Sequence, residues 1–169
     1  MKRIGIVLLL AACGGGQGDV SDVPDTAAQT PPAATTAMPM SVSVEQFAQL
    51  RWLEGTWRGS GVEQPTFYER YSFADDSTIR AESSPDSTFP HPEEASTIQL
   101  RAGRVTTGEG TMEWALTSLD ATSVRFDPVR NARNTFVWRR DGDSAWTATL
   151  SWTEQGERCE RVYDMRRMP

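Results

Sequence analysis

The hydrophobic pattern of the chain changes period at Thr56. The segment before it carries large apolar residues at the spacing of one helix face, namely Phe47, Leu50 and Leu53. Ser43-Val44-Glu45-Gln46 has the form of a capping box at the start of this segment, and Gly55 suits the end of a helix. The sequence therefore predicts one short helix over residues 43–53.

From Thr56 onward the pattern has a period of two, which is typical of strands with one buried face. Short runs rich in Thr, Val, Phe, Tyr and Trp are separated by turn residues such as Asp141-Gly142-Asp143. The predicted strands are 56–62, 66–73, 77–84, 95–101, 104–107, 111–118, 122–127, 134–140, 144–153 and 158–166. Ten short strands with no second helix predict an all-β domain, residues 41–169, folded as an up-and-down antiparallel barrel without free edges.

The N-terminus has the pattern of an export signal. Lys2 and Arg3 precede an apolar run from Ile4 to Ala12 that is too short to span a bilayer. The run ends in Leu10-Ala11-Ala12-Cys13, which resembles the lipobox of bacterial lipoproteins. That resemblance implies a signal peptide over residues 1–12 and a lipid on Cys13. The alternative is an ordinary secretory signal followed by an incidental cysteine.

Residues 13–40 read as a tether between the lipid and the barrel. They are mostly Gly, Pro, Ala, Thr, Gln and Asp, a composition that buries too little apolar surface to repay the entropy of ordering. A flexible segment of this length spans about 30 Å. Gly14 stands where the inner-membrane retention signal of lipoproteins would have Asp, so we expect the outer membrane, facing the periplasm, if the organism has two membranes.

The charge balance limits the partners. The full chain has a formal net charge of −6, and removal of residues 1–12 takes away Lys2 and Arg3, which gives −8. An acidic chain is poorly suited to nucleic acid or to electrostatic attraction to anionic lipid. We expect contact with a membrane through the lipid on Cys13, and beyond that a small ligand or an envelope protein.

Two segments near the ends of the predicted barrel resemble the calycin superfamily. Trp52-Leu53-Glu54-Gly55-Thr56-Trp57 resembles its opening, where Gly-x-Trp begins the first strand after a short helix. Arg161-Val162-Tyr163 resembles the Arg-x-Tyr of fatty-acid-binding proteins, and Tyr163-Asp164-Met165-Arg166-Arg167 is similar to the end of small bacterial lipocalin-like domains related in shape to nitrobindins. The resemblance implies a calycin-like barrel. It departs at Pro128–Arg133, where that bacterial family commonly carries a histidine and carboxylates.

Arg161 and Tyr163 are the first candidates for ligand binding. They lie two residues apart on one predicted strand, so they share a face. The resemblance implies that they hold a ligand carboxylate, which a guanidinium fork and a phenol can do. In the alternative, Arg161 closes the barrel by packing over Trp57 and Tyr163 is a core residue. Glu69 either points inward and pairs with Arg161 or lies in water at a strand end.

Three functions follow from these residues. The first is binding of a small, largely apolar ligand, with a carboxylate as one option, by Arg161, Tyr163, Glu69 and Trp57. The second is a non-enzymatic envelope module with a filled barrel, whose loops contact another protein. The third is an enzyme, for which the chain offers only Glu69 with Arg161 and Tyr163. His91 is the single histidine, so we expect no metal site, no haem and no other cofactor.

Overall fold

The computed structural model describes residues 38–90 and 94–169. The predicted signal peptide, Cys13, most of the predicted tether and His91 lie outside these residues. Within them, no helix is long and apolar enough to cross a membrane.

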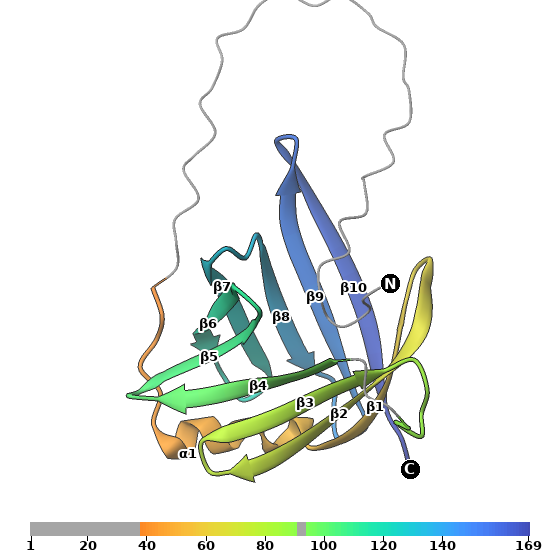
Figure 1. The fold of residues 1–169 in the computed structure, drawn as a ribbon, viewed down its shortest axis with the longest axis horizontal. Coiled ribbons are helices and arrows are strands. Elements are labelled where there is room, and N and C mark those ends of the chain that lie inside the picture. The colour runs from red at the N-terminus through yellow and green to blue at the C-terminus, as the bar shows by residue number, and fades with distance from the viewer. Residues whose placement is uncertain (1–37, 91–93) are drawn as a thin grey trace, which may run out of the picture.

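The predicted barrel is confirmed (Figure 1). Its strands are β1 (Gly55–Gly61), β2 (Gln64–Asp75), β3 (Thr78–Ser84), β4 (Glu94–Arg101), β5 (Arg104–Glu109), β6 (Met112–Leu119), β7 (Ser123–Arg130), β8 (Asn134–Arg140), β9 (Ala145–Glu154) and β10 (Glu157–Arg167). Each strand pairs antiparallel with its neighbours in sequence, and β1 pairs with β10 to close the cylinder. The β9–β10 hairpin extends beyond the other strands in Figure 1.

The predicted helix is present but changes type along its length. It begins as α1 (Val44–Phe47), with both hydrogen bonds of the capping box at Ser43 and Gln46, and continues as the 3₁₀ helix η1 (Ala48–Leu53). A 3₁₀ helix has three residues per turn, so apolar residues spaced by three stay on one side. All three of them, Phe47, Leu50 and Leu53, are fully buried.

This helical segment covers one end of the barrel (Figure 1). Phe47 meets the ring of Phe73 on β2 edge to face at 6.0 Å, and Trp52 meets Trp146 on β9 at 5.9 Å. Arg51 adds its guanidinium at 4.3 Å from the centre of the Phe73 ring. We call this the closed end. Ser84 at the end of β3 and Glu109 at the end of β5 lie at the opposite, open end.

Candidate ligand-binding site

A half-enclosed cavity of about 90 Å³ lies within the barrel toward the open end. Its apolar side, which we call the aromatic wall, consists of four rings from β2, β6 and β8: Tyr71, Trp114, Phe136 and Trp138. Its polar side includes Glu69, Ser83, Glu94 and Glu109. The envelope-module alternative assumes a filled barrel. The cavity shows that the interior is not filled throughout.

The cavity opens where β4 and β5 separate. Their last pair toward the open end is Ile98 with Thr107, although β4 starts at Glu94 and β5 continues to Glu109. Beyond that pair β5 remains bonded to β6, through the pairs Gly108 with Glu113 and Glu109 with Met112. Glu94 and Glu109 both line the cavity at this gap. We call this pair of glutamates the acidic mouth.

Glu69 reaches the cavity because of the strand register. Glu69 lies opposite Ser83, and Ser83 lies opposite Glu94. Directly opposed residues of antiparallel strands point to the same side of a sheet. This row across β2, β3 and β4 places all three side chains against one interior space.

Glu69 is a buried carboxyl with one neutral hydrogen-bond partner. It is 4% exposed, and the Tyr71 hydroxyl donates to its Oε2 over 2.6 Å. Burial raises the pKa of Glu69 to about 8, and the hydrogen bond from Tyr71 offsets this only in part. At neutral pH Glu69 is therefore mostly a protonated acid, which can donate as well as accept a hydrogen bond.

Two further polar atoms at the cavity lack hydrogen-bond partners among the described residues. Ser83 is 6% exposed and Trp138 is 4% exposed, and neither Ser83 Oγ nor Trp138 Nε1 finds a partner there. Both residues line the cavity. A buried polar group without a partner costs free energy that a bound molecule can recover by completing its hydrogen bonds.

The alternative in which Arg161 packs over Trp57 is wrong, because Arg167 occupies that place. The Arg167 guanidinium lies 4.3 Å from the centre of the Trp57 ring and donates to the carbonyl oxygens of Glu54 at 2.7 Å, Trp52 at 3.0 Å and Asp143 at 2.9 Å. The cause is register, since Trp57 pairs with Arg167. Arg161 lies six residues further along β10, a separation of about 20 Å in an extended strand.

Gly55 provides the space that this arginine needs. A Cβ atom at Gly55 would lie 2.5 Å from Arg167 Nη1, and the residue has a φ of 128°, which L side chains rarely adopt. The glycine of the Gly-x-Trp segment and the last arginine of the chain's closing segment therefore form one contact.

Arg161 and Tyr163 share a face, as predicted, but they lie toward the open end of β10 and are not among the residues that line the cavity. Arg161 Nη1 donates to the Tyr163 hydroxyl at 3.4 Å, and its Cζ lies 5.7 Å from the centre of the Trp152 ring. Tyr163 packs edge to face on Phe67 at 5.3 Å.

The predicted pairing of Glu69 with Arg161 is absent among the ion pairs of the described residues. Glu69 bonds to Tyr71 instead. The set Glu69, Arg161 and Tyr163, on which the enzyme hypothesis depended, does not converge on one site. Trp57 is 1% exposed, donates from Nε1 to the Leu53 carbonyl at 2.6 Å, and belongs to the closed end.

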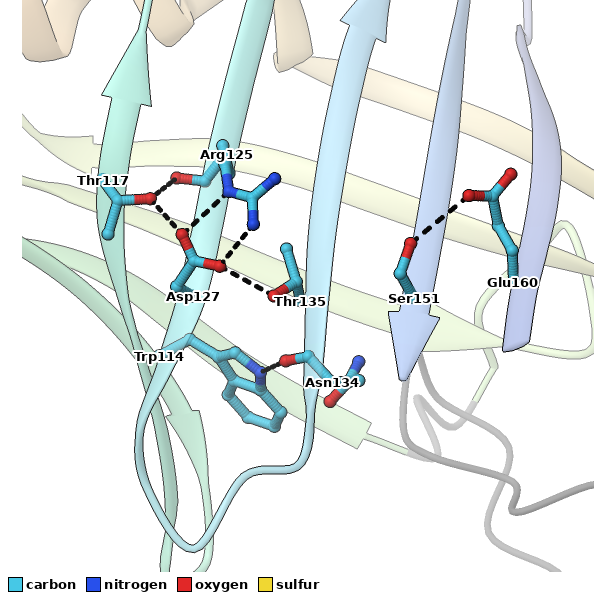
Figure 2. A network of polar contacts seen from close by, with 8 residues as sticks. All are labelled: Trp114, Thr117, Arg125, Asp127, Asn134, Thr135, Ser151 and Glu160. Atoms are coloured by element: carbon cyan, nitrogen blue, oxygen red, sulfur yellow. Dashed lines mark hydrogen bonds and ion pairs between the residues drawn. The ribbon is translucent and has the colours of Figure 1, made fainter. Parts of the chain in front are cut away.

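A polar network on the outer wall supports the strands of the aromatic wall (Figure 2). Asp127 on β7 accepts two hydrogen bonds from Arg125 and one from each of two hydroxyls, Thr117 on β6 and Thr135 on β8. Burial alone would raise the pKa of Asp127, but the hydrogen bonds together outweigh it and lower the pKa. The Asp127 carboxylate thus ties together three neighbouring strands, β6, β7 and β8.

The segment Pro128–Arg133, where the resemblance to lipocalin-like domains breaks down in the sequence, forms the end of β7 and the turn into β8. Asn131 has a positive φ of 54° and donates from Nδ2 to the Thr111 carbonyl at 3.1 Å. Just after this turn, the Asn134 carbonyl accepts the Trp114 Nε1 hydrogen bond at 2.8 Å, also drawn in Figure 2. The turn therefore positions one ring of the aromatic wall.

Sequence reasoning found Glu69 but missed Ser83, Glu94, Glu109 and Trp138 as cavity residues. The period of two could have placed two of these residues on the inner face, because Glu109 is in phase with Thr107 on its strand and Ser83 is in phase with Ile79. The phase of a residue gives its face of the wall, but it does not show where neighbouring strands separate. Among the described residues, no group of three or more His, Cys, Asp or Glu side chains is placed to hold a metal ion.

Comparisons with known proteins gave no match to a family model and none to a curated protein. Among solved structures, the chain is similar to EF1p2_mFAP2b bound to DFHBI, at 12% identity and a TM-score of 0.37, covering 75% of this chain and 100% of that one. It is also similar to a redesigned beta barrel, b11L5F_LGL, at 11% identity and a TM-score of 0.32, covering 78% and 100%. Likenesses at this level carry no argument about function.

Proposed function

We propose that the barrel binds a small, largely apolar ligand in the cavity between the aromatic wall and the acidic mouth. The observation that supports this is the combination of a half-enclosed space with two buried polar atoms, Ser83 Oγ and Trp138 Nε1, that have no hydrogen-bond partner among the described residues. Concave sites with apolar walls and a few convergent polar groups are the usual form of small-molecule sites.

A carboxylate is a poor fit for this cavity. Its ionisable lining residues, apart from Tyr71, are glutamates, and among the described lining residues none is basic. An anion beside these side chains would be repelled unless they took up protons. The Arg161 and Tyr163 pair remains a separate hypothesis for carboxylate binding nearer the open end.

The test blocks the cavity from within. Ser96 lines the cavity on β4, and the adjacent Thr97 is exposed on the outer face, so Ser96→Leu and Thr97→Leu add similar bulk on opposite sides of the wall. We expect the neutral probe 2-phenylethanol to bind the parent and Thr97→Leu with equal affinity and Ser96→Leu at least tenfold more weakly, measured by ligand-observed NMR. Equal binding to all three would contradict the cavity as the site.

The proposal also places the barrel at a membrane, through a lipid on Cys13. Its support is the sequence alone: the signal-like run, the Ala-Ala-Cys segment and the lack of another long apolar segment in the tether. In an organism with two membranes, we expect the protein to be anchored in the outer membrane, facing the periplasm.

Replacing Cys13 tests the anchor. The parent should partition with membranes and carry a diacylglycerol thioether on Cys13 in the mass spectrum, while Cys13→Ser should be found in the aqueous fraction. Membrane retention of the variant, or a mature parent in which Cys13 is joined to Cys159 instead of to a lipid, would refute the lipoprotein proposal because the same thiol cannot serve both.

A further inference from the structure

The aromatic wall of the cavity contains an indole N–H group that has no hydrogen-bond partner. Trp138 lines the cavity and is 4% exposed, and its Nε1 finds no acceptor within the described part of the chain. An indole nitrogen can only donate, so no rotation and no change of protonation supplies the missing bond. Trp138 Nε1 therefore calls for an acceptor that the described residues do not provide.

Packing holds this indole in place. The Trp138 ring lies 5.4 Å from Phe136, 5.5 Å from Phe126 and 6.0 Å from Tyr71, measured between ring centres. Contacts on several sides restrict the rotamer of a ring, so the donor is fixed before a ligand arrives. The other indole of the aromatic wall differs, because Trp114 Nε1 donates to the Asn134 carbonyl at 2.8 Å.

The polar groups on the far side of the barrel are less demanding. Ser83 lies on β3, five strands away from β8 around the cylinder, and its Oγ also lacks a partner among the described residues. A hydroxyl can donate or accept, as can the protonated acid of Glu69. These groups accommodate either kind of polar atom, whereas Trp138 Nε1 accommodates only an acceptor.

Charge narrows the kind of acceptor. No Arg, Lys or His is present among the lining residues that the structure describes, so an anionic acceptor would enter without a compensating cation. An ammonium group has donors only and would leave Trp138 Nε1 without its bond. A carbonyl oxygen accepts through two lone pairs, carries no formal charge and adds no donor that needs a partner of its own.

We infer that the preferred ligand is an uncharged ring compound with a carbonyl oxygen, which accepts a hydrogen bond from Trp138 Nε1 while the ring packs on the aromatic wall. This inference rests on the proposed function and narrows it to one chemical class. The cavity of about 90 Å³ is open on one side, which suits a body of about one ring.

Two probes of nearly the same shape isolate the carbonyl oxygen. Acetophenone has this oxygen, and α-methylstyrene has a CH₂ group in its place. Because α-methylstyrene is the more hydrophobic of the two, the measured quantity is the ratio of their affinities for the full chain, compared between the parent and Trp138→Phe. We expect the ratio to fall at least fivefold, in the direction of weaker acetophenone binding, when the indole N–H is removed.

Trp146→Phe is the matched control. Trp146 is 1% exposed, its Nε1 likewise lacks a partner among the described residues, and it is not one of the cavity residues. Its ring lies 5.6 Å from that of Trp138, so the variant disturbs the packing around Trp138 and keeps the donor. We expect the ratio to stay within twofold of the parent. An equal fall in both variants would assign the effect to packing and overturn the inference.

The indole N–H signal of Trp138 in the NMR spectrum of the parent gives a readout that needs no variant. Both probes contribute a similar ring current, but only acetophenone can accept the hydrogen bond. At saturation we expect this signal to lie further downfield with acetophenone than with α-methylstyrene. The same position with both probes would overturn the inference, even if Trp138→Phe fails to fold.

The outcomes distinguish the two proposals. If 2-phenylethanol binds and acetophenone does not, or if the affinity ratio is the same in the parent and Trp138→Phe, the carbonyl inference is wrong and the ligand-binding function stands. If benzoate, the anionic counterpart of acetophenone, binds more tightly than acetophenone, the inference is wrong and the Arg161 and Tyr163 pair becomes the relevant site. If none of the four compounds binds the parent, both proposals are overturned.

Discussion

The two ends of this barrel use ionisable side chains in opposite ways. At the closed end, Arg167 has its guanidinium on the Trp57 ring and donates one hydrogen bond from each of its three guanidinium nitrogens to a carbonyl oxygen. At the open end, Glu69 and Glu109 lie against a cavity, and Glu109 Oε2 and Ser83 Oγ lack partners among the described residues. A charge held by several hydrogen bonds stabilises the fold, whereas buried polar atoms without partners are available to a ligand.

The largest test of this comparison is a pair of tryptophan truncations. Trp57→Ala removes a fully buried ring at the closed end and should lower the free energy of unfolding by about 4 kcal/mol. Trp152→Ala removes a partly exposed ring at the open end and should cost about 1–2 kcal/mol. Urea unfolding followed by circular dichroism measures both. Equal losses would show that the ends do not differ in packing.

The second test uses the raised pKa of Glu69. Its folded pKa of about 8 exceeds the ordinary value of 4.5, so the folded state keeps a proton that the unfolded state loses. The parent therefore loses stability as the pH rises from about 4.5 to 8, by up to about 1.4 kcal/mol per pH unit. Glu69→Gln cannot ionise and should be about 4–5 kcal/mol more stable than the parent at pH 8.5, with little difference at pH 4.

Chemical unfolding across pH 4–9 checks this difference. Glu160→Gln on the outer face of β10 is the control and should follow the parent at every pH. A difference between Glu69→Gln and the parent that does not change with pH would mean that Glu69 is ionised in the folded protein.

The third test concerns the arginine at the closed end. Arg167→Met keeps an apolar stem over Trp57 but loses three hydrogen bonds to carbonyl oxygens, so the free energy of unfolding should fall by about 2 kcal/mol. Arg166→Met, next to it on the outer face, should change stability by less than about 0.5 kcal/mol. The melting temperatures of the two variants provide the measurement, and a larger loss in Arg166→Met would contradict the assignment.

The smallest effect is expected at Arg161. Among the contacts of Arg161, those with Tyr163 at 3.4 Å and with the Trp152 ring at 5.7 Å are longer than those of Arg167 with its partners. Arg161→Met should therefore lower the free energy of unfolding by less than about 1 kcal/mol. A loss as large as that of Arg167→Met would show that both ends depend on an arginine for stability.

The sequence by itself determined the architecture. The period of two gave all ten strands because a barrel wall has one buried and one exposed face, and that alternation is written in each strand. The three-residue spacing before Gly55 gave the helical segment. The shared face of Arg161 and Tyr163 also followed from their phase, whereas the sequence left open whether Glu69 points inward or lies in water at a strand end. What the pattern could not give is the position of one strand along another.

The tertiary structure decided which of these residues meet. Register brings Trp57 to Arg167 and not to Arg161, although both arginines lie on the same face of β10. Register also places Glu69, Ser83 and Glu94 in one row, while the separation of β4 from β5 beyond Ile98 and Thr107 opens the cavity beside Glu109. These contacts join residues far apart in the chain, and their positions depend on how ten strands close into one cylinder. Local alternation constrains only the side of the wall on which each residue lies.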